Sequence, residues 1–169
     1  REWSKQRSTG ENYAVVCYLS QYGFCDRLSQ AIAHGIGKAN AQVQLVDLIA
    51  SDTQELSALI SDASAVVVPT WPIKSDSELQ SNIGTLLASL KQKQWVATYD
   101  SYGGNEEPID FITNQLRKLG QKEAFKPLRV RDEPNKSVYQ QFEEAGTDLG
   151  QILTRKKNLA ATKSLDGDL

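Results

Sequence analysis

Short apolar runs alternate with amphipathic segments along most of the chain. The runs are rich in Val, Tyr and other residues that favour strands, and several of them have apolar residues at successive positions, as strands buried on both faces do. We expect strands at residues 13–19, 42–47, 64–69, 95–100 and 124–130. The pattern therefore predicts five strands with a helix after each.

The amphipathic segments carry Leu and Ile at helical spacing, so each has one apolar face. In the first helix, over 26–38, Leu28, Ile32 and Ile36 recur every four residues. Ser51-Asp52-Thr53 with Glu55 is an N-cap signal for a short second helix, in which Leu56, Leu59 and Ile60 form the apolar face. The third and fifth helices are expected at 78–91 and 137–154. The fourth is expected to begin at Glu107-Pro108 and to end at a Gly120 cap, with Leu116 and Leu119 facing inward.

Strict alternation of strand and helix predicts an α/β fold with a parallel sheet and helices on both of its faces, which makes three layers. Five strands suit the order 2-1-3-4-5, in which the strand order reverses between strands one and three. Ligands of such sheets bind beyond the carboxyl ends of the strands at this reversal. The loops after Leu19, Pro69 and Asp100 are therefore the candidate site.

Length and composition fit one globular domain. The chain has 169 residues, of which 40% are hydrophobic and 24% charged, with a net charge of −2. This charge lacks the basic surplus of a nucleic-acid binder, and no apolar run approaches the length of a membrane span. We expect residues 13–154 to form the domain and the polar segments 1–12 and 155–169 to be linkers to neighbouring domains, because the chain contains no methionine and both ends are weakly periodic.

The cysteines and the single histidine predict neither a disulfide nor a metal site. Cys17 falls in an apolar run and Cys25 in a loop, which indicates a reducing compartment, the cytoplasm. His34 is the only histidine, too few for an ordinary protein metal site.

The three candidate loops share hydroxyl, aromatic or glycine residues. The first joins a strand to a helix N-terminus, where backbone N–H groups and the helix dipole favour an anion. In the second, Trp71 between two prolines offers a rigid platform for a flat ring, and Tyr102 offers another in the third. The expected ligand has a phosphate and a flat aromatic system, and its expected binding residues are Ser20, Gln21, Tyr22, Gly23, Phe24, Cys25, Pro69, Thr70, Trp71, Pro72, Ser101, Tyr102, Gly103, Gly104 and Asn105.

Several segments of the chain follow the sequence pattern of one known family. The first loop, Ser20 to Cys25, resembles the phosphate loop of flavodoxins. Three further sets of segments are Tyr18 to Gly23 followed by Asp26 to Ile32, Ser101 to Gly104 with Glu106 to Asp110, and Glu143 to Gly150. Together these segments resemble the flavodoxin-like domain of cyanobacterial flavodiiron proteins. The chain departs from the family pattern at Cys25, at Trp71-Pro72 and at Asn105-Glu106.

This resemblance implies a flavodoxin-like fold that binds flavin mononucleotide (FMN) and transfers electrons. It also implies a parent enzyme, an oxidoreductase with a diiron domain that reduces dioxygen to water, and a flavin reductase-like domain or another reduced electron donor. Electrons would pass from FMN to the diiron centre, typically of the other subunit in a head-to-tail dimer. The chain alone would be an electron carrier with no metal and no catalytic residue of its own, no nucleic-acid partner and no membrane span.

Two alternatives remain open at the level of sequence. The departures from the family pattern are compatible with an interaction module that has lost its flavin. A phosphoacceptor domain has the same fold, but it requires acidic residues after strand one and an Asp after strand three. Ser20-Gln21 and Pro69-Thr70 occupy those positions here, which disfavours it.

Overall fold

The computed structural model describes residues 13–20, 24–70, 77–91, 93–102, 111–131 and 133–167. The predicted linker 1–12 lies outside these residues.

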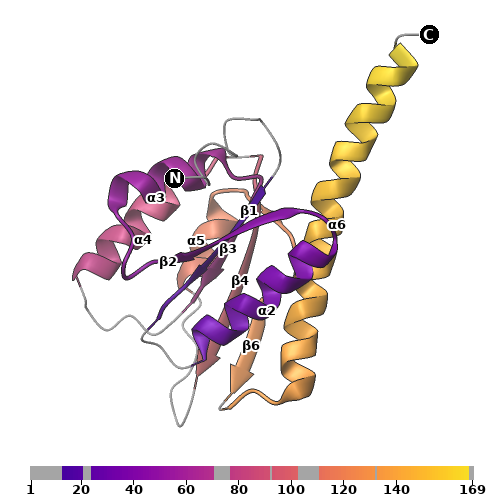
Figure 1. Cartoon of the computed structure of the whole chain (residues 1–169). Coiled ribbons are helices and arrows are strands. Elements are labelled where there is room, and N and C mark those ends of the chain that lie inside the picture. Colours follow the sequence, from indigo (N-terminus) through magenta and orange to yellow (C-terminus); the bar gives the residue numbers. More distant parts are fainter. Residues whose placement is uncertain are drawn as a thin grey trace.

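One parallel sheet forms the centre of the molecule (Figure 1). Its strands are β1 (Tyr13–Tyr18), β2 (Gln42–Asp47), β3 (Ala65–Pro69), β4 (Trp95–Tyr102), β5 (Lys122–Glu123) and β6 (Leu128–Arg131). The order is β2-β1-β3-β4-β5, and β6 also pairs with β4. The predicted order and the parallel pairing are both confirmed, so the reversal lies between β1 and β3.

Five described helices cover the sheet: α2 (Cys25–Lys38), α3 (Thr53–Asp62), α4 (Ser77–Ser89), α5 (Phe111–Lys118) and α6 (Lys136–Gly167). Figure 1 shows α2 and α6 side by side at one face and α3 with α4 at the opposite face. The predicted N-cap of α3 is confirmed, because the Asp52 carboxylate accepts a hydrogen bond from the Glu55 backbone N–H at 3.2 Å. The three-layer arrangement follows directly from the alternation in the sequence.

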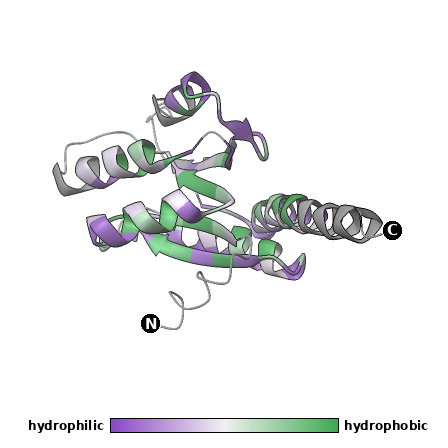
Figure 2. Ribbon diagram, turned by 90° about the horizontal axis from the view of Figure 1, so that it is seen from above, coloured by the Kyte–Doolittle hydropathy of each residue, from purple (hydrophilic) through white to green (hydrophobic). Residues whose placement is uncertain are grey.

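The core lies on both faces of the two central strands. Every residue of β3 is buried, as are the first five of β1. The apolar stripes predicted for α2 and α3 are buried as expected, and Figure 2 shows hydrophobic residues concentrated along the strands and the inner helix faces. Strands buried on both faces explain why β1 and β3 read as continuous apolar runs.

Helices α2 and α6 approach each other through glycines. A Cβ atom added at Gly35 would overlap the backbone oxygen of Glu143, and one added at Gly146 would overlap that of Ile32. Gly150 lies similarly close to Ile36. These glycines allow the backbones of α2 and α6 to contact each other directly.

The predicted fifth strand at 124–130 is wrong in detail. The chain forms two short strands there, β5 and β6, and both pair with β4. Ala124 still donates its backbone N–H to the Val96 oxygen at 2.7 Å, but Pro127 has no N–H to continue a ladder. The single edge strand is therefore divided into two pieces.

Two further expectations about helices are wrong. Leu119, predicted to face inward, is 44% exposed, because α5 ends at Lys118 and Leu119 lies in the turn that follows, where Gly120 adopts a φ of 72°. The fifth helix, predicted to end at 154, continues as α6 to Gly167, so that residues 155–167, predicted to be a linker, are helical (Figure 1). That this segment leads to another domain stays a prediction, as does the helix start at Glu107-Pro108, which lies outside the described residues.

The glycine contact between α2 and α6 can be tested by substitution. We expect Gly146→Ala to lower the free energy of unfolding by about 1–3 kcal/mol, because the new methyl group forces the two helices apart. Gly37→Ala on α2 is the matched control, since nothing lies within 4 Å of its added Cβ. Its higher helix propensity should leave stability unchanged or raise it by up to ~1 kcal/mol. Equal urea midpoints for both variants would contradict the packing described here.

Candidate functional site

The carboxyl ends of β1, β3 and β4 meet at one edge of the sheet, here called the rim. These strands are neighbours in parallel register, so the loops that follow them start side by side. Ser20, Phe24, Cys25, Pro69 and Thr70 are described there, and the backbone of Ser101 and Tyr102 belongs to the end of β4. The other predicted binding residues lie outside the described residues: Gln21, Tyr22, Gly23, Trp71, Pro72, Gly103, Gly104 and Asn105.

The N-terminus of α2 lies at the rim beside the reversal of strand order. Phe24 is its N-cap residue and makes no side-chain capping hydrogen bond, while within the first turn the Asp26 carboxylate accepts from the Arg27 N–H at 2.8 Å. At the N-cap of an α-helix, the side-chain oxygen of Ser, Thr, Asp or Asn is the preferred acceptor for the first free N–H groups. The first turn therefore suits an external anion, which would interact with its N–H groups and with the helix dipole.

Ser20 lies at the end of β1 and is exposed. Its backbone N–H donates to Asp47 Oδ1 at 3.4 Å, and the same oxygen accepts from the Ile49 N–H at 3.0 Å. Asp26 adds a second carboxylate in the first turn of α2. An anion at this loop would thus be held by backbone and hydroxyl donors in the presence of two nearby carboxylates.

Cys25 is the first residue of α2. The prediction that it lies in a loop is therefore wrong. Its side chain is 6% exposed, and Sγ accepts a hydrogen bond from the Leu19 N–H at 3.3 Å. Sγ also lies 3.4 Å from the hydroxyl of Tyr99, which donates to the Cys17 carbonyl at 2.5 Å. The thiol thus ties the first loop to β1 and β4 from the inside.

Burial also determines the ionisation of these groups. It raises the pKa of the Cys25 thiol to about 11, and it raises the pKa of the Tyr99 hydroxyl well above its ordinary value. Both groups are therefore neutral at physiological pH. Cys17 and Cys25 are both free thiols, as predicted.

The sequence reasoning missed a polar cluster formed by Thr70, Asp100 and Arg129. The Thr70 hydroxyl donates to Asp100 Oδ2 at 3.2 Å, and Arg129 Nε lies 3.6 Å from the same oxygen. The Thr70 N–H donates to the Tyr99 carbonyl at 2.8 Å, which extends the contact between β3 and β4. The signal in the sequence that could have indicated this cluster is Asp100, a carboxylate near the end of a strand, β4, whose other residues are mostly apolar.

Asp100 is only 4% exposed, and its Oδ1 has no hydrogen-bond partner among the described residues. Burial raises the pKa of its carboxyl to about 6, although Arg129 and the Thr70 hydroxyl both act to lower it. A buried carboxylate with one unsatisfied oxygen is costly, and such groups concentrate at functional sites. The cluster therefore adds Asp100 to the residues of the rim.

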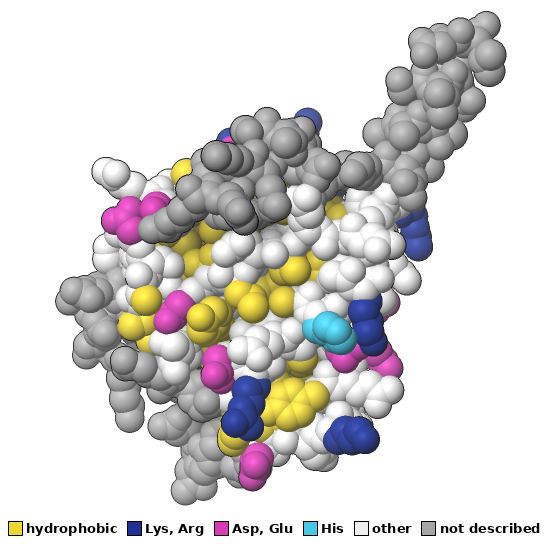
Figure 3. All heavy atoms as spheres, viewed as in Figure 1, with side chains coloured by type: hydrophobic (Ala, Val, Ile, Leu, Met, Phe, Trp, Pro, Cys, Tyr) yellow, Lys and Arg dark blue, Asp and Glu magenta, His cyan; other side chains and the backbone are white. Residues whose placement is uncertain are grey.

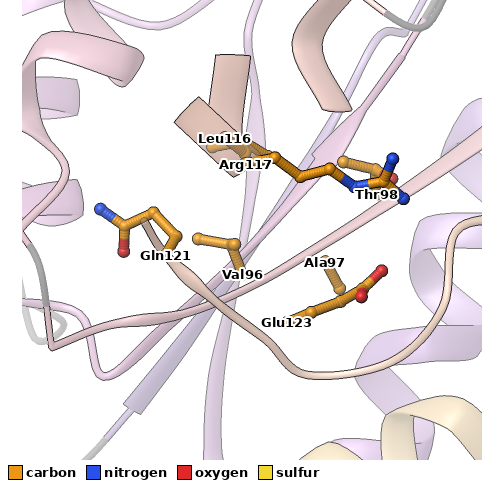
Figure 4. Close-up of a pocket in the computed structure, with 7 residues that line it drawn as sticks. All are labelled: Val96, Ala97, Thr98, Leu116, Arg117, Gln121 and Glu123. Atoms are coloured by element: carbon orange, nitrogen blue, oxygen red, sulfur yellow. The ribbon is translucent and has the colours of Figure 1, made fainter. Parts of the chain in front are cut away.

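Two described cavities lie away from the rim. One, of about 170 Å³, lies between β4 and α5 and is lined by Val96, Leu116 and Arg117 among others (Figure 4). The second, of about 250 Å³, lies at the opposite end of the strands and includes Lys91, Lys93 and Trp95. Neither is lined by any residue of the predicted site, parts of which lie outside the described residues.

His34 lies on α2, with Nδ1 3.5 Å from Glu143 Oε1 of α6, and Lys38 forms an ion pair with the same carboxylate. In Figure 3 basic and acidic side chains lie beside the histidine. Within the described part of the chain, no group of three or more His, Cys, Asp or Glu side chains could hold a metal. Nor does any described helix have the length and apolar character needed to cross a membrane.

The raised pKa of Asp100 predicts how stability depends on pH. Because the folded-state pKa of about 6 exceeds the ordinary Asp pKa of 3.8, the native state binds more protons between these pH values, and its stability falls as the pH rises through them. We expect Asp100→Asn to remove this component, so its stability relative to wild type should improve by up to about 3 kcal/mol between about pH 4 and pH 7.

Urea unfolding at several pH values measures this difference. Asp148→Asn, at an exposed position of α6, is the control and should follow the wild-type pH profile. Parallel profiles for wild type and Asp100→Asn would show that the carboxyl titrates normally.

Comparison with known proteins identifies the family. The flavodoxin family matches residues 16–146. Diflavin flavoprotein A 1 of Synechocystis sp. is 45% identical over 169 residues, which are 100% of this chain but 30% of that protein. The chain thus spans about 30% of the length of this curated relative and of a second one, from Nostoc sp..

Solved structures agree in fold. The flavodoxin-like domain of a Synechococcus sp. protein is 46% identical with a TM-score of 0.78, covering 84% of this chain and 99% of that domain. The flavodiiron core of Flv1 from Synechocystis sp. is 29% identical with a TM-score of 0.78, covering 92% of this chain and 39% of that core. With the family match and the sheet order, these likenesses show that the chain belongs to the flavodoxin family, as a flavodoxin-like domain of the kind found in diflavin and flavodiiron proteins.

Proposed function

We propose that this chain is the FMN-binding, electron-transfer domain of a flavodiiron oxygen reductase. The observation that supports this most is the 45% identity to a diflavin flavoprotein over the whole chain. The rim adds a physical reason, because the α2 N-terminus without a side-chain cap lies beside the strand reversal. A phosphate there would take the place of a capping side chain.

The residues of the three loops divide the binding task. Ser20 to Cys25 would hold the phosphate, mainly through backbone N–H groups and hydroxyls, while Cys25 keeps that loop attached to the core. Trp71 and Tyr102 would flank the flavin ring, and Thr70 and Asp100 would fix the ends of the strands beneath it. FMN supplies the redox chemistry when bound, and the protein supplies binding, orientation and electrostatics.

Oxygen reduction in this proposal belongs to the parent protein. Electrons would leave the flavin for a diiron domain, in the other subunit of a head-to-tail dimer, after delivery by a flavin reductase-like domain or another donor. The related Flv1 structure is described as a flavodiiron core, which supports such a partner domain. We place the parent protein in the cytoplasm.

The phosphate loop predicts that the chain binds FMN more tightly than riboflavin. A hydrogen bond to a charged group contributes about 1.5–3 kcal/mol, so one phosphate contact already corresponds to a preference of about tenfold or more. Fluorescence quenching titrations with both flavins measure the preference. Ser20→Asp should reduce it by repelling the phosphate while leaving riboflavin affinity unchanged.

Gln151→Glu is the charge control, because it adds one negative charge at an exposed position of α6. It should leave both affinities at their wild-type values. Equal affinity for FMN and riboflavin would contradict the proposal that Ser20 to Cys25 bind the phosphate. Binding of neither flavin by the folded chain would favour an interaction module that has lost its flavin.

A further inference from the structure

The two edges of the sheet differ in how they are protected. One edge consists of β5 and β6, two short pieces that carry the charged residues Lys122, Glu123 and Arg129. The other is the outer side of β2, here called the β2 edge, which runs unbroken over Gln42–Asp47 and has no charged residue before Asp47. Natural sheets keep their edge strands from pairing with other chains by short strands, prolines and charges. The β2 edge lacks all three before Asp47.

Alternate residues of β2 direct their backbone groups to the β2 edge. The Leu48 N–H donates to the Tyr18 carbonyl of β1 at 2.9 Å, so Leu48 and the strand residues an even number of positions before it face β1. Val43 and Leu45 therefore point their N–H and C=O groups outward, and neither N–H has a partner among the described residues. The Gln44 side-chain amide donates to the Leu45 carbonyl at 3.3 Å, which shows that this outward oxygen is able to accept a hydrogen bond.

Partly buried apolar side chains accompany these open backbone groups. Val43 and Leu45 pack against the core without being fully buried. Hydrophobic side chains lie across the middle of the face shown in Figure 3, the area that β2 crosses in the same view of Figure 1. A strand added at this edge would cover apolar surface and satisfy backbone groups at the same time.

We propose that the β2 edge binds the β2 edge of a second copy of this chain, in an antiparallel pair that joins the two sheets into one. Residues 41–46 are uncharged, so two identical strands meet there without repulsion. Each chain has one such edge, so the pairing is complete with two copies and does not continue into a fibre. This inference does not depend on the proposed flavin site.

A two-fold axis beside Gln44 places the outward apolar residues opposite one another. Val43 of one copy then lies opposite Leu45 of the other, and each such pair exchanges two N–H···O bonds. The two Gln44 residues face each other as a non-hydrogen-bonded pair, with Cα atoms about 4.5 Å apart. Asp47 lies opposite Ala41 of the other copy, so no two carboxylates meet. Because β1, β3 and β4 run parallel to β2, the rims of the two copies point in opposite directions.

Sedimentation of the whole chain over a range of concentrations measures the association. The contact is one strand wide, so we expect a reversible dimer that forms at about 0.1–1 mM. Gln44→Lys places two like charges opposite each other at the centre of the pair and should weaken the association by about tenfold or more. Gln151→Lys makes the same change at an exposed position of α6 and should dimerise like wild type.

Cysteine cross-linking tests the register and stays informative if Gln44→Lys impairs folding. Gln44→Cys should give a disulfide-linked dimer on mild oxidation, because the facing Cα atoms lie within the ~7 Å that a disulfide spans. Gln42→Cys is the matched control, since its two cysteines lie four residues apart along the paired strands, about 14 Å, and should stay unlinked. The native Cys17 and Cys25 are buried and add no background.

A chain that stays monomeric at about 1 mM would overturn the pairing, as would a dimer that Gln44→Lys leaves intact. Equal cross-linking of the two cysteine variants, or of neither, would contradict the register on which the proposal depends. Hydrogen exchange gives a separate check, because the Val43 and Leu45 N–H groups should become protected only when the dimer forms. Protection of these groups in the monomer would show instead that the edge is covered within one chain.

Discussion

The double pairing of β1 is the constraint on which the rest of the structure depends. β1 forms parallel ladders with β2 on one side and β3 on the other, and Ala14, Val15 and Val16 are paired on both sides. The chain has to leave β1 at its carboxyl end and return along a face of the sheet, which α2 does. The reversal of strand order, the place of the α2 N-terminus and therefore the position of the rim all follow from this pairing.

Hydrogen bonds in the core connect β1 and β4 to the first residue of α2 at the rim. Tyr99 of β4 donates to the Cys17 carbonyl of β1, and its ring lies edge-on to Phe142 of α6, with centroids 6.2 Å apart. Because the hydroxyl proton of Tyr99 is used by Cys17, the Cys25 thiol can donate to the tyrosine oxygen. The start of α2 is thereby fixed to two strands before any ligand binds, which lowers the ordering that binding has to impose.

The sequence predicted the fold where one physical signal dominated. β1, β3 and α2 were located almost to the residue, because continuous apolar runs and a four-residue repeat have few alternative interpretations. The split at Pro127 and the exposure of Leu119 depend on chain geometry at the sheet edge, which local periodicity does not contain. Asp100 was missed because its significance lies in burial beside Thr70 and Arg129, and those contacts join residues far apart in the sequence. The rim itself was predictable from topology, whereas its acidic character was not.

The inward orientation of Cys25 has a consequence for oxidative chemistry. Sulfur is oxidised by peroxide chiefly as the thiolate, and access of the oxidant sets the rate as strongly as ionisation does. Cys25 is a buried thiol with a raised pKa, engaged by the Leu19 N–H and the Tyr99 hydroxyl. Cys25 is therefore protected from sulfenic acid formation, although it lies at the rim.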